Sequence, residues 1–179
     1  MPIIPFEKAS EIVAYMRESG ENCGVNFDKI VLAHGVYDNL HGGHVLQLSR
    51  IKEEYPRCLL LVSITDDENV RKNKGEGRPF CSQDLRVKML EQQLSVDYVL
   101  ISPHASAVPV ITEVKPDVYV KGEEYLSTLD SNWALKREKA LVEKLGGKLV
   151  FIGSEVPHMS TSILNAAGDN DKNSQYNQA

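Results

Sequence analysis

The sequence predicts a single α/β domain of the doubly wound, Rossmann-like type, built on a five-stranded parallel sheet. Short apolar runs alternate with amphipathic segments along most of the 179 residues. The run at 58–64 (CLLLVSI) is almost continuously apolar, which is typical of a strand buried on both faces of a parallel sheet. Such sheets bind ligands beyond the carboxyl ends of their strands, so we expect the chemistry in the loops that follow the strands.

Five apolar runs give the expected strands, and the segments between them give the helices. The strands are expected at 29–33, 58–64, 98–101, 118–120 and 149–152. The helices are expected at 6–19, 43–54, 83–94, 108–114 and 133–145, with a last helix beginning at 160–166. The polar segment between the second strand and the helix at 83–94 is expected to be a basic loop. In that helix, the spacing predicts that Leu85, Met89 and Leu94 share one side.

The chain is predicted to have three parts. Residues 1–28 form an N-terminal helix and lead-in, residues 29–167 form the α/β domain, and residues 168–179 form a polar tail expected to be disordered. Trp133, at the start of its helix, is expected to pack on the core, with shielding of a bound ligand as the alternative.

Composition excludes several classes of protein. A net charge of −5 disfavours a general nucleic-acid binder, which would normally be basic. The three cysteines form no CxxC pair and no metal-ligand spacing, which indicates reduced thiols and a cytoplasmic protein. The N-terminus lacks the pattern of a signal peptide, and no apolar run is long enough to span a membrane.

The segment HGVYDNLHGGH follows the first expected strand and opens the next helix. If the helix begins near Gly42, His41 and His44 lie close together at its N-terminus, where backbone N–H groups and the helix dipole attract anions. Two imidazole donors there would hold a polyphosphate and stabilise the charge that develops on it. Three interpretations of Asp38 stay open: a magnesium ligand, a group that orients a donor, or a helix cap. A pair of ordinary surface histidines is the competing interpretation of the motif.

A basic segment follows the second expected strand. It contains Lys74 and Arg78 beside glycines, and Asp84 and Arg86 come six and eight positions after Arg78. Lysine provides a mobile point charge and arginine a two-pronged donor, a combination that suits a triphosphate. By composition alone, a solvated basic loop is the alternative interpretation.

Two further segments carry candidate phosphate-binding groups. Lys121 directly follows the strand at 118–120, which puts it at the ligand-binding edge of the sheet. Hydroxyl side chains at 160–162 stand at the start of the last expected helix, where they cap the helix or bind phosphate. An ordinary strand-end lysine and helix capping alone are the competing interpretations.

Together these segments resemble the cytidylyltransferase-like family of nucleotidyltransferases. The resemblance rests on GVYDNLHGGH, on the spacing of the basic segment and on KPDVYVKGEEY, and it runs from about residue 29 to 165. It implies that 29–167 is a nucleotidyltransferase domain. Within the family, the chain is most similar to the adenylyltransferase domain of ADP-heptose synthases and to relatives fused to sugar-kinase domains. Lys121 carries this preference, because cytidylyltransferases for glycerol or ethanolamine phosphate usually lack it. Where the family often has Gly-Asp, this chain has Glu123-Glu124.

The resemblance also implies roles for individual residues. It implies catalytic roles for His41, His44, Lys74, Arg86 and Lys121. It implies nucleotide or phosphate binding by His34, Gly35, Val36, Tyr37, Asp38, Gly43, Thr65, Asp67, Arg78, Gly122, Glu124, Ser160, Thr161 and Ser162. Mg²⁺ is expected to arrive with the nucleoside triphosphate and to bridge its phosphates, with Asp38 as the one candidate for a direct protein ligand.

The implied reaction transfers a nucleoside monophosphate from ATP or CTP to a small phosphorylated substrate and releases pyrophosphate. The first choice of acceptor is a sugar phosphate resembling heptose 1-phosphate. The alternatives are a cytidylyltransferase for glycerol phosphate or another alcohol phosphate, and a non-catalytic nucleotide-binding module. The resemblance further implies a homodimer and a separate sugar kinase in the same pathway, with no nucleic-acid or membrane partner.

Overall fold

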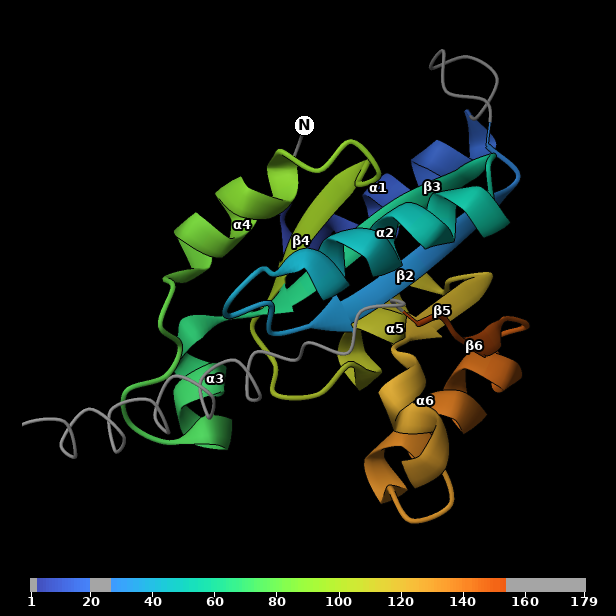
Figure 1. The fold of residues 1–179 in the computed structure, drawn as a ribbon. Coiled ribbons are helices and arrows are strands. Elements are labelled where there is room, and N and C mark those ends of the chain that lie inside the picture. Colours follow the sequence, from blue (N-terminus) through green and yellow to red (C-terminus); the bar gives the residue numbers. More distant parts are fainter. Residues whose placement is uncertain (1–2, 20–26, 154–179) are drawn as a thin grey trace, which may run out of the picture.

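The computed structural model describes residues 3–19 and 27–153, which are arranged around one six-stranded parallel sheet (Figure 1). The strands are β1 (Ile3–Ile4), β2 (Lys29–Gly35), β3 (Cys58–Thr65), β4 (Tyr98–Ser102), β5 (Val118–Lys121) and β6 (Lys148–Phe151). The α-helices are α1 (Ala9–Glu18), α2 (Gly42–Glu54), α3 (Asp67–Lys74), α4 (Gln83–Glu91), α5 (Val108–Val114) and α6 (Trp133–Lys144). Two 3₁₀ helices, η1 (Phe6–Lys8) and η2 (Glu123–Thr128), complete the described elements.

The predicted fold class is confirmed, but the predicted number of strands is wrong. The sixth strand is β1, which pairs in parallel with β4 through Ile3↔Val99 and Ile4↔Leu100. A strand of two residues is too short to show an alternating pattern, so periodicity could not reveal it. Ile4 and the buried face of α1 pack into one of the two hydrophobic cores that flank the sheet. The predicted boundary at residue 29 stays a prediction, and the tail at 168–179 lies outside the described residues.

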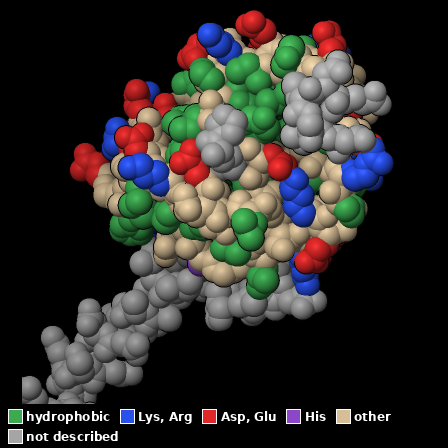
Figure 2. Space-filling view, turned by 90° about the horizontal axis from the view of Figure 1, so that it is seen from above, with side chains coloured by type: hydrophobic (Ala, Val, Ile, Leu, Met, Phe, Trp, Pro, Cys, Tyr) green, Lys and Arg blue, Asp and Glu red, His purple; other side chains and the backbone are tan. Residues whose placement is uncertain are grey.

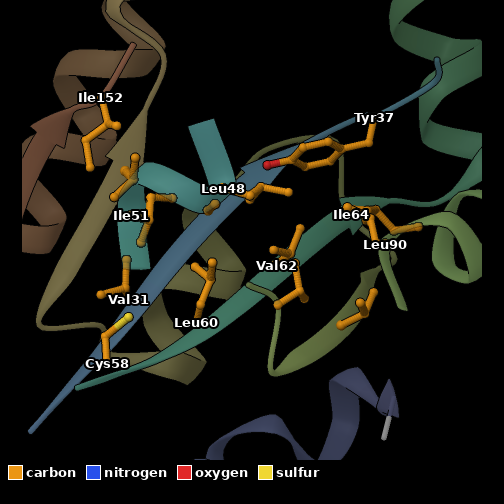
Figure 3. Close-up of a cluster of buried hydrophobic side chains, with 14 of the residues drawn as sticks. Val31, Tyr37, Leu48, Ile51, Cys58, Leu60, Val62, Ile64, Leu90 and Ile152 are labelled. Atoms are coloured by element: carbon orange, nitrogen blue, oxygen red, sulfur yellow. The ribbon is translucent and has the colours of Figure 1, made fainter. Parts of the chain in front are cut away.

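Helices cover both faces of the sheet, and each face has its own hydrophobic core. Alternate residues of β3 serve the two cores: Leu60 and Val62 lie in the cluster beneath α2 and α4, which Figure 3 shows. Leu59 and Leu61 lie in the cluster shared with α1, α5 and α6 on the other face. Because every residue of β3 is buried, the prediction of a strand covered on both faces is confirmed.

The buried side of α4 differs from the predicted one. The helix buries Arg86, Val87 and Leu90, whereas Leu85 is 47% exposed. Leu94, which lies beyond the end of the helix, is fully exposed. Hydrophobic spacing alone favoured the wrong side because the buried side of the helix includes a charged residue, Arg86, which makes its hydrogen bonds in the interior.

Two further expectations differ from the structure. Trp133 is 72% exposed, so the expectation that it packs on the core is wrong. Part of the expected basic loop is the helix α3, whose first turn carries Asp67 and Glu68 and whose last turn carries three basic residues. Asp66 caps it by accepting a hydrogen bond from the N–H of Asn69. Acidic groups at the N-terminus and basic groups at the C-terminus both stabilise the helix dipole.

The strand order is β1-β4-β3-β2-β5-β6, and the direction in which successive strands are added to the sheet switches between β2 and β5. From β2 the chain extends to β3 and β4 on one side, then returns to place β5 and β6 on the other side. The loops after β2 and β5 therefore leave the sheet in opposite directions and open a crevice between them, which is the usual ligand site of this architecture.

The surface seen from above Figure 1 carries acidic and basic side chains mixed around apolar ones (Figure 2). Among the described residues visible in this view, basic side chains are interspersed with acidic ones. Among the residues that the structure describes, no helix has the length and apolar character needed to cross a membrane.

Candidate functional site

A pocket of about 350 Å³ lies at the carboxyl ends of the strands, where the crevice between β2 and β5 is expected. The residues predicted from sequence that line it are His34, Gly35, Val36, Tyr37, Asp38, His44, Thr65, Lys74, Arg78, Lys121, Gly122 and Glu124. They come from the carboxyl ends of β2, β3 and β5, from the segments that follow these strands and from the start of α2, which are far apart in the sequence. The structure thus brings most of the predicted site residues to one place.

The two histidines of the HGGH motif lie together at the N-terminus of α2. His41 is the N-cap, and its Nδ1 accepts a hydrogen bond of 3.1 Å from the backbone N–H of Gly43. With Nδ1 as the acceptor of this bond, the proton on the His41 ring lies on Nε2, where it can donate. The rings of His41 and His44 stack with centroids 4.0 Å apart, and the ring of Tyr37 lies 5.0 Å from that of His44. The helix cap is thus the histidine itself, and the cap interpretation of Asp38 is wrong.

The histidines at the crevice are held in their neutral form. The pKa of His44 is lowered to about 4, mainly by burial and in addition by the charges of His41 and Lys74. A backbone hydrogen bond at Asn39 acts in the opposite direction and raises this pKa. Burial, followed by the charge of Lys121, lowers the pKa of His34 to about 3. The ring of His34 lies 3.2 Å from the hydroxyl of Ser63 on the adjacent strand. Near neutral pH the rings of His34 and His44 are therefore uncharged hydrogen-bonding groups.

Asp38 is a buried anchor for the segment at 78–81. One carboxylate oxygen accepts from Arg78 at 2.7 Å, and the other accepts from the backbone N–H groups of Phe80 and Cys81. Burial by itself would raise the pKa of Asp38, but these hydrogen bonds and the charge of Arg78 together lower it. Of its three interpretations, the structure supports the orientation of a donor, because Asp38 fixes Arg78 at the pocket wall.

Asp38 is the residue that the sequence offered as a direct ligand of a metal ion. Both oxygens of Asp38 are occupied by protein donors, so its interpretation as a magnesium ligand is not supported. Within the described parts of the chain, no group of three or more His, Cys, Asp or Glu side chains could hold a metal ion.

Arg86 is fully buried and faces the interior instead of the pocket. Its guanidinium donates to the carbonyl oxygens of Val36, Thr65 and Cys81 at 2.6, 2.8 and 3.1 Å. It also pairs with Asp67 at 2.7 Å. These bonds tie together the loops after β2 and β3 and the start of α4. The predicted catalytic role of Arg86 is therefore replaced by a structural one: the residue shapes two walls of the pocket from behind.

Glu124 and Lys121 form the wall on the β5 side. A side chain on Gly122 would collide with the carboxylate of Glu124, so this carboxylate lies against the backbone of the VKG motif. Lys121 pairs with Glu138 of α6 at 3.5 Å. Sequence reasoning missed Glu138, although it was the one charged residue in the buried stripe of its helix. It also missed Gln47, Tyr125 and the segment at 105–107 as lining residues.

The hydroxyl residues Ser160, Thr161 and Ser162 lie outside the described residues. The last described residues, Ile152 and Gly153, are held beside the pocket by α2. Gln47 donates to the carbonyl of Ile152 at 2.8 Å, and Arg50 donates to that of Gly153 at 3.1 Å.

Comparison with known proteins agrees with the resemblance found in the sequence. A family model described as cytidylyltransferase-like matches residues 32–165. The bifunctional protein HldE of Desulfatibacillum aliphaticivorans is 32% identical over 160 residues, which cover 89% of this chain and 30% of that protein. The bifunctional protein HldE of Campylobacter concisus is 38% identical over 120 residues, which cover 67% of this chain and 25% of that protein. This chain thus spans less than a third of the length of these two relatives.

A solved structure agrees with the fold. A lipopolysaccharide core biosynthesis protein from Thermoplasma volcanium matches with a TM-score of 0.57 and 25% identity, over 72% of this chain and 100% of that one. The resemblance inferred from the HGGH motif and its surroundings is therefore confirmed by family model, relatives and fold.

Proposed function

The chain belongs to the cytidylyltransferase-like family of nucleotidyltransferases, and on this premise we propose that it transfers a nucleoside monophosphate from ATP or CTP to a sugar 1-phosphate of the heptose type. The observation that carries the proposal is the pocket between β2 and β5. It joins the N-terminus of α2 with His44 on one side to Lys121 on the other, and Lys74 and Arg78 lie at its wall. Donors and cations on opposite walls suit a reaction in which two anionic groups must meet.

In the proposed reaction, an oxygen of the acceptor phosphate attacks the α-phosphorus of the nucleoside triphosphate. A bond forms between that oxygen and the α-phosphorus, and the bond from the α-phosphorus to its bridging oxygen breaks, so that pyrophosphate leaves with the electron pair. The acceptor is already ionised near neutral pH, and catalysis then consists of positioning and charge stabilisation. We assign stabilisation of the α-phosphate to His41 and His44, of the leaving pyrophosphate to Lys74 and the hydroxyls at 160–162, and of the acceptor phosphate to Lys121. The divalent cation, Mg²⁺ in our proposal, is delivered by the triphosphate.

The β5 side of the pocket supports a polyhydroxylated acceptor over a small alcohol phosphate. Besides Lys121, this side contains the carboxylate of Glu124 and the ring of Tyr125. Carboxylates accept hydrogen bonds from hydroxyl groups. A sugar phosphate offers several hydroxyls to such a wall, whereas glycerol phosphate offers two.

The relatives named as bifunctional suggest where the acceptor comes from. We propose that a separate sugar kinase supplies the phosphorylated acceptor and that the enzyme works in the cytoplasm as a homodimer. The family match at 32–165 supports placing the nucleotidyltransferase domain at 29–167.

The test is a matrix of four nucleoside triphosphates against several sugar 1-phosphates and alcohol phosphates, scored by pyrophosphate release with Mg²⁺ present. We expect one sugar 1-phosphate to exceed every alcohol phosphate in kcat/KM. His44→Ala should lower kcat by about 10²–10³, the usual loss for one stabilising donor. His104→Ala is the matched control, because His104 contacts the ring of Phe6 and does not line the pocket.

The outcomes separate the candidate functions. If the enzyme prefers glycerol phosphate, its acceptor is an alcohol phosphate and the proposal of a sugar 1-phosphate is wrong. Nucleotide binding without pyrophosphate release from any pair would support the non-catalytic module. Near-normal turnover by His44→Ala would contradict the assignment of the motif.

A further inference from the structure

Lys121 lies at the end of β5 on the same face of the sheet as Tyr119. Successive side chains of a strand point to opposite faces, so residues two apart share one face. Val118 and Val120 belong to the core beneath α2 and α4, whereas Tyr119 belongs to the core shared with α5 and α6. Lys121 therefore emerges toward α6, the helix that carries Glu138.

One carboxylate oxygen of Glu138 joins these two side chains of β5. The hydroxyl of Tyr119 donates to Oε2 of Glu138 at 2.9 Å, and the same Oε2 lies 3.5 Å from Nζ of Lys121. The Lys121 ammonium also lies 5.3 Å from the ring centroid of Tyr119 and 5.5 Å from that of Tyr125. It is thus held by a carboxylate and two aromatic rings, and its rotamers are restricted.

Stability does not explain Glu138. The buried residues of α6 are Leu135, Glu138 and Val142, which lie along one side of the helix. Glu138 therefore places a carboxylate at a position where an apolar side chain would be expected. Replacing a buried ion pair by well-packed apolar residues is often neutral or stabilising. Burial and the charge of Glu138 also raise the pKa of Tyr119, which keeps its hydroxyl available as the donor. The charged group is therefore better explained by what it does to Lys121.

We propose that Glu138, oriented by Tyr119, is a positioning residue that holds the ammonium of Lys121 toward the phosphate of the acceptor. The inference rests on the proposed function for the identity of that phosphate. Glu138 fixes the direction of Lys121 before the acceptor arrives, so that little side-chain freedom is lost on binding. The hydroxyl of Tyr119 donates to the same carboxylate oxygen that faces Lys121 and so fixes its position.

The kinetic test is a double-mutant cycle on the full chain. Glu138→Ala should raise the KM of the acceptor about tenfold, because misplacing one positioning group weakens substrate alignment by at least that factor. The KM of the nucleoside triphosphate should change less than about twofold in the same variant, since independent sites do not couple. In a Lys121→Ala background, Glu138→Ala should have no further effect. Glu138→Gln should recover part of the loss, because its amide oxygen still accepts from Tyr119.

Controls distinguish positioning from loss of structure. Glu143→Ala removes a carboxylate of the same helix that pairs with Lys139 on the surface, and it should leave both KM values unchanged. Tyr119→Phe keeps the buried ring and removes only the hydroxyl, so it should raise the acceptor KM in the same direction as Glu138→Ala. Additive losses in the double variant, or an acceptor KM lowered by Glu138→Ala, would overturn the proposal.

A measurement without substrate separates this inference from the proposed function. In the wild-type protein, Lys121 should react slowly with an amine-acetylating reagent, as followed by mass spectrometry with surface Lys139 as the internal reference. Glu138→Ala should accelerate the acetylation of Lys121 about fivefold or more, because a released side chain samples more rotamers. If wild-type protein transfers no nucleotide, the proposed function fails, and this rate still decides the role of Glu138. An unchanged rate in both Glu138→Ala and Glu138→Gln would refute it.

Discussion

The buried position of Arg86 leads to a sharp prediction about stability. Arg86→Met keeps an unbranched side chain of similar length but removes every donor of the guanidinium. Three backbone carbonyl oxygens and the carboxylate of Asp67 then lose their partner. Leaving the remaining charge of a buried pair uncompensated costs about 3–5 kcal/mol. We therefore expect the free energy of unfolding to fall by about that amount.

This loss is large compared with the total stability of a folded domain, which is about 5–15 kcal/mol. For a chain of this size it corresponds to a decrease in Tm of about 6–20 °C, at about 2–4 °C per kcal/mol. Urea unfolding followed by circular dichroism measures the free energy directly. Arg86→Lys retains the charge and one donor direction, and it should lie between wild type and Arg86→Met.

The matched control is Lys88→Met, which removes an exposed cation from the same helix and should change the free energy of unfolding by less than about 0.5 kcal/mol. If Arg86 instead bound nucleotide directly, Arg86→Met would leave the unfolding curve near that of wild type and weaken nucleotide binding alone. A loss below about 1 kcal/mol would therefore refute the structural role, because even one unsatisfied buried acceptor costs that much.

Three further predictions concern the stability of the fold. In the folded protein the pKa is about 3 for His34 and about 4 for His44, below the ordinary 6.5. Between each lowered pKa and pH 6.5, the unfolded chain therefore binds more protons than the folded protein does. The free energy of unfolding should then fall as the pH falls from about 6.5 to 4, by up to about 1.4 kcal/mol per pH unit for each histidine, and urea titrations of His34→Gln should show a shallower fall. Asp38→Asn should lower the free energy of unfolding by about 1–3 kcal/mol, whereas Asp28→Asn, in an exposed pair, should cost less than about 1 kcal/mol by the same urea assay. Gly147→Ala would drive its new methyl group into a backbone carbonyl and should lower Tm in a thermal scan, at a cost of about 1–3 kcal/mol, and an unchanged Tm would contradict the crowding.

Much of the site could be predicted from sequence because its signals are local. The HGGH motif specifies a helix N-terminus within four residues, and the structure begins α2 at Gly42 with His41 as its cap. Lys121 comes directly after the apolar run at 118–120 and is the last residue of β5, so its place at the carboxyl edge needed only the identification of that run. Contacts between neighbours in sequence depend on backbone geometry, which residue spacing encodes.

The sequence by itself thus determined the order of the elements, the position of the motif at a helix N-terminus and the family. Only the tertiary structure decided which charged side chains face the ligand. Arg86 turned inward because carbonyl groups from two other loops meet at one point behind the pocket. Glu138 reached Lys121 because α6 packs across the end of β5. Spacing indicates which residues share one face of an element, but the direction of that face and its partners are fixed by packing between segments distant in the chain.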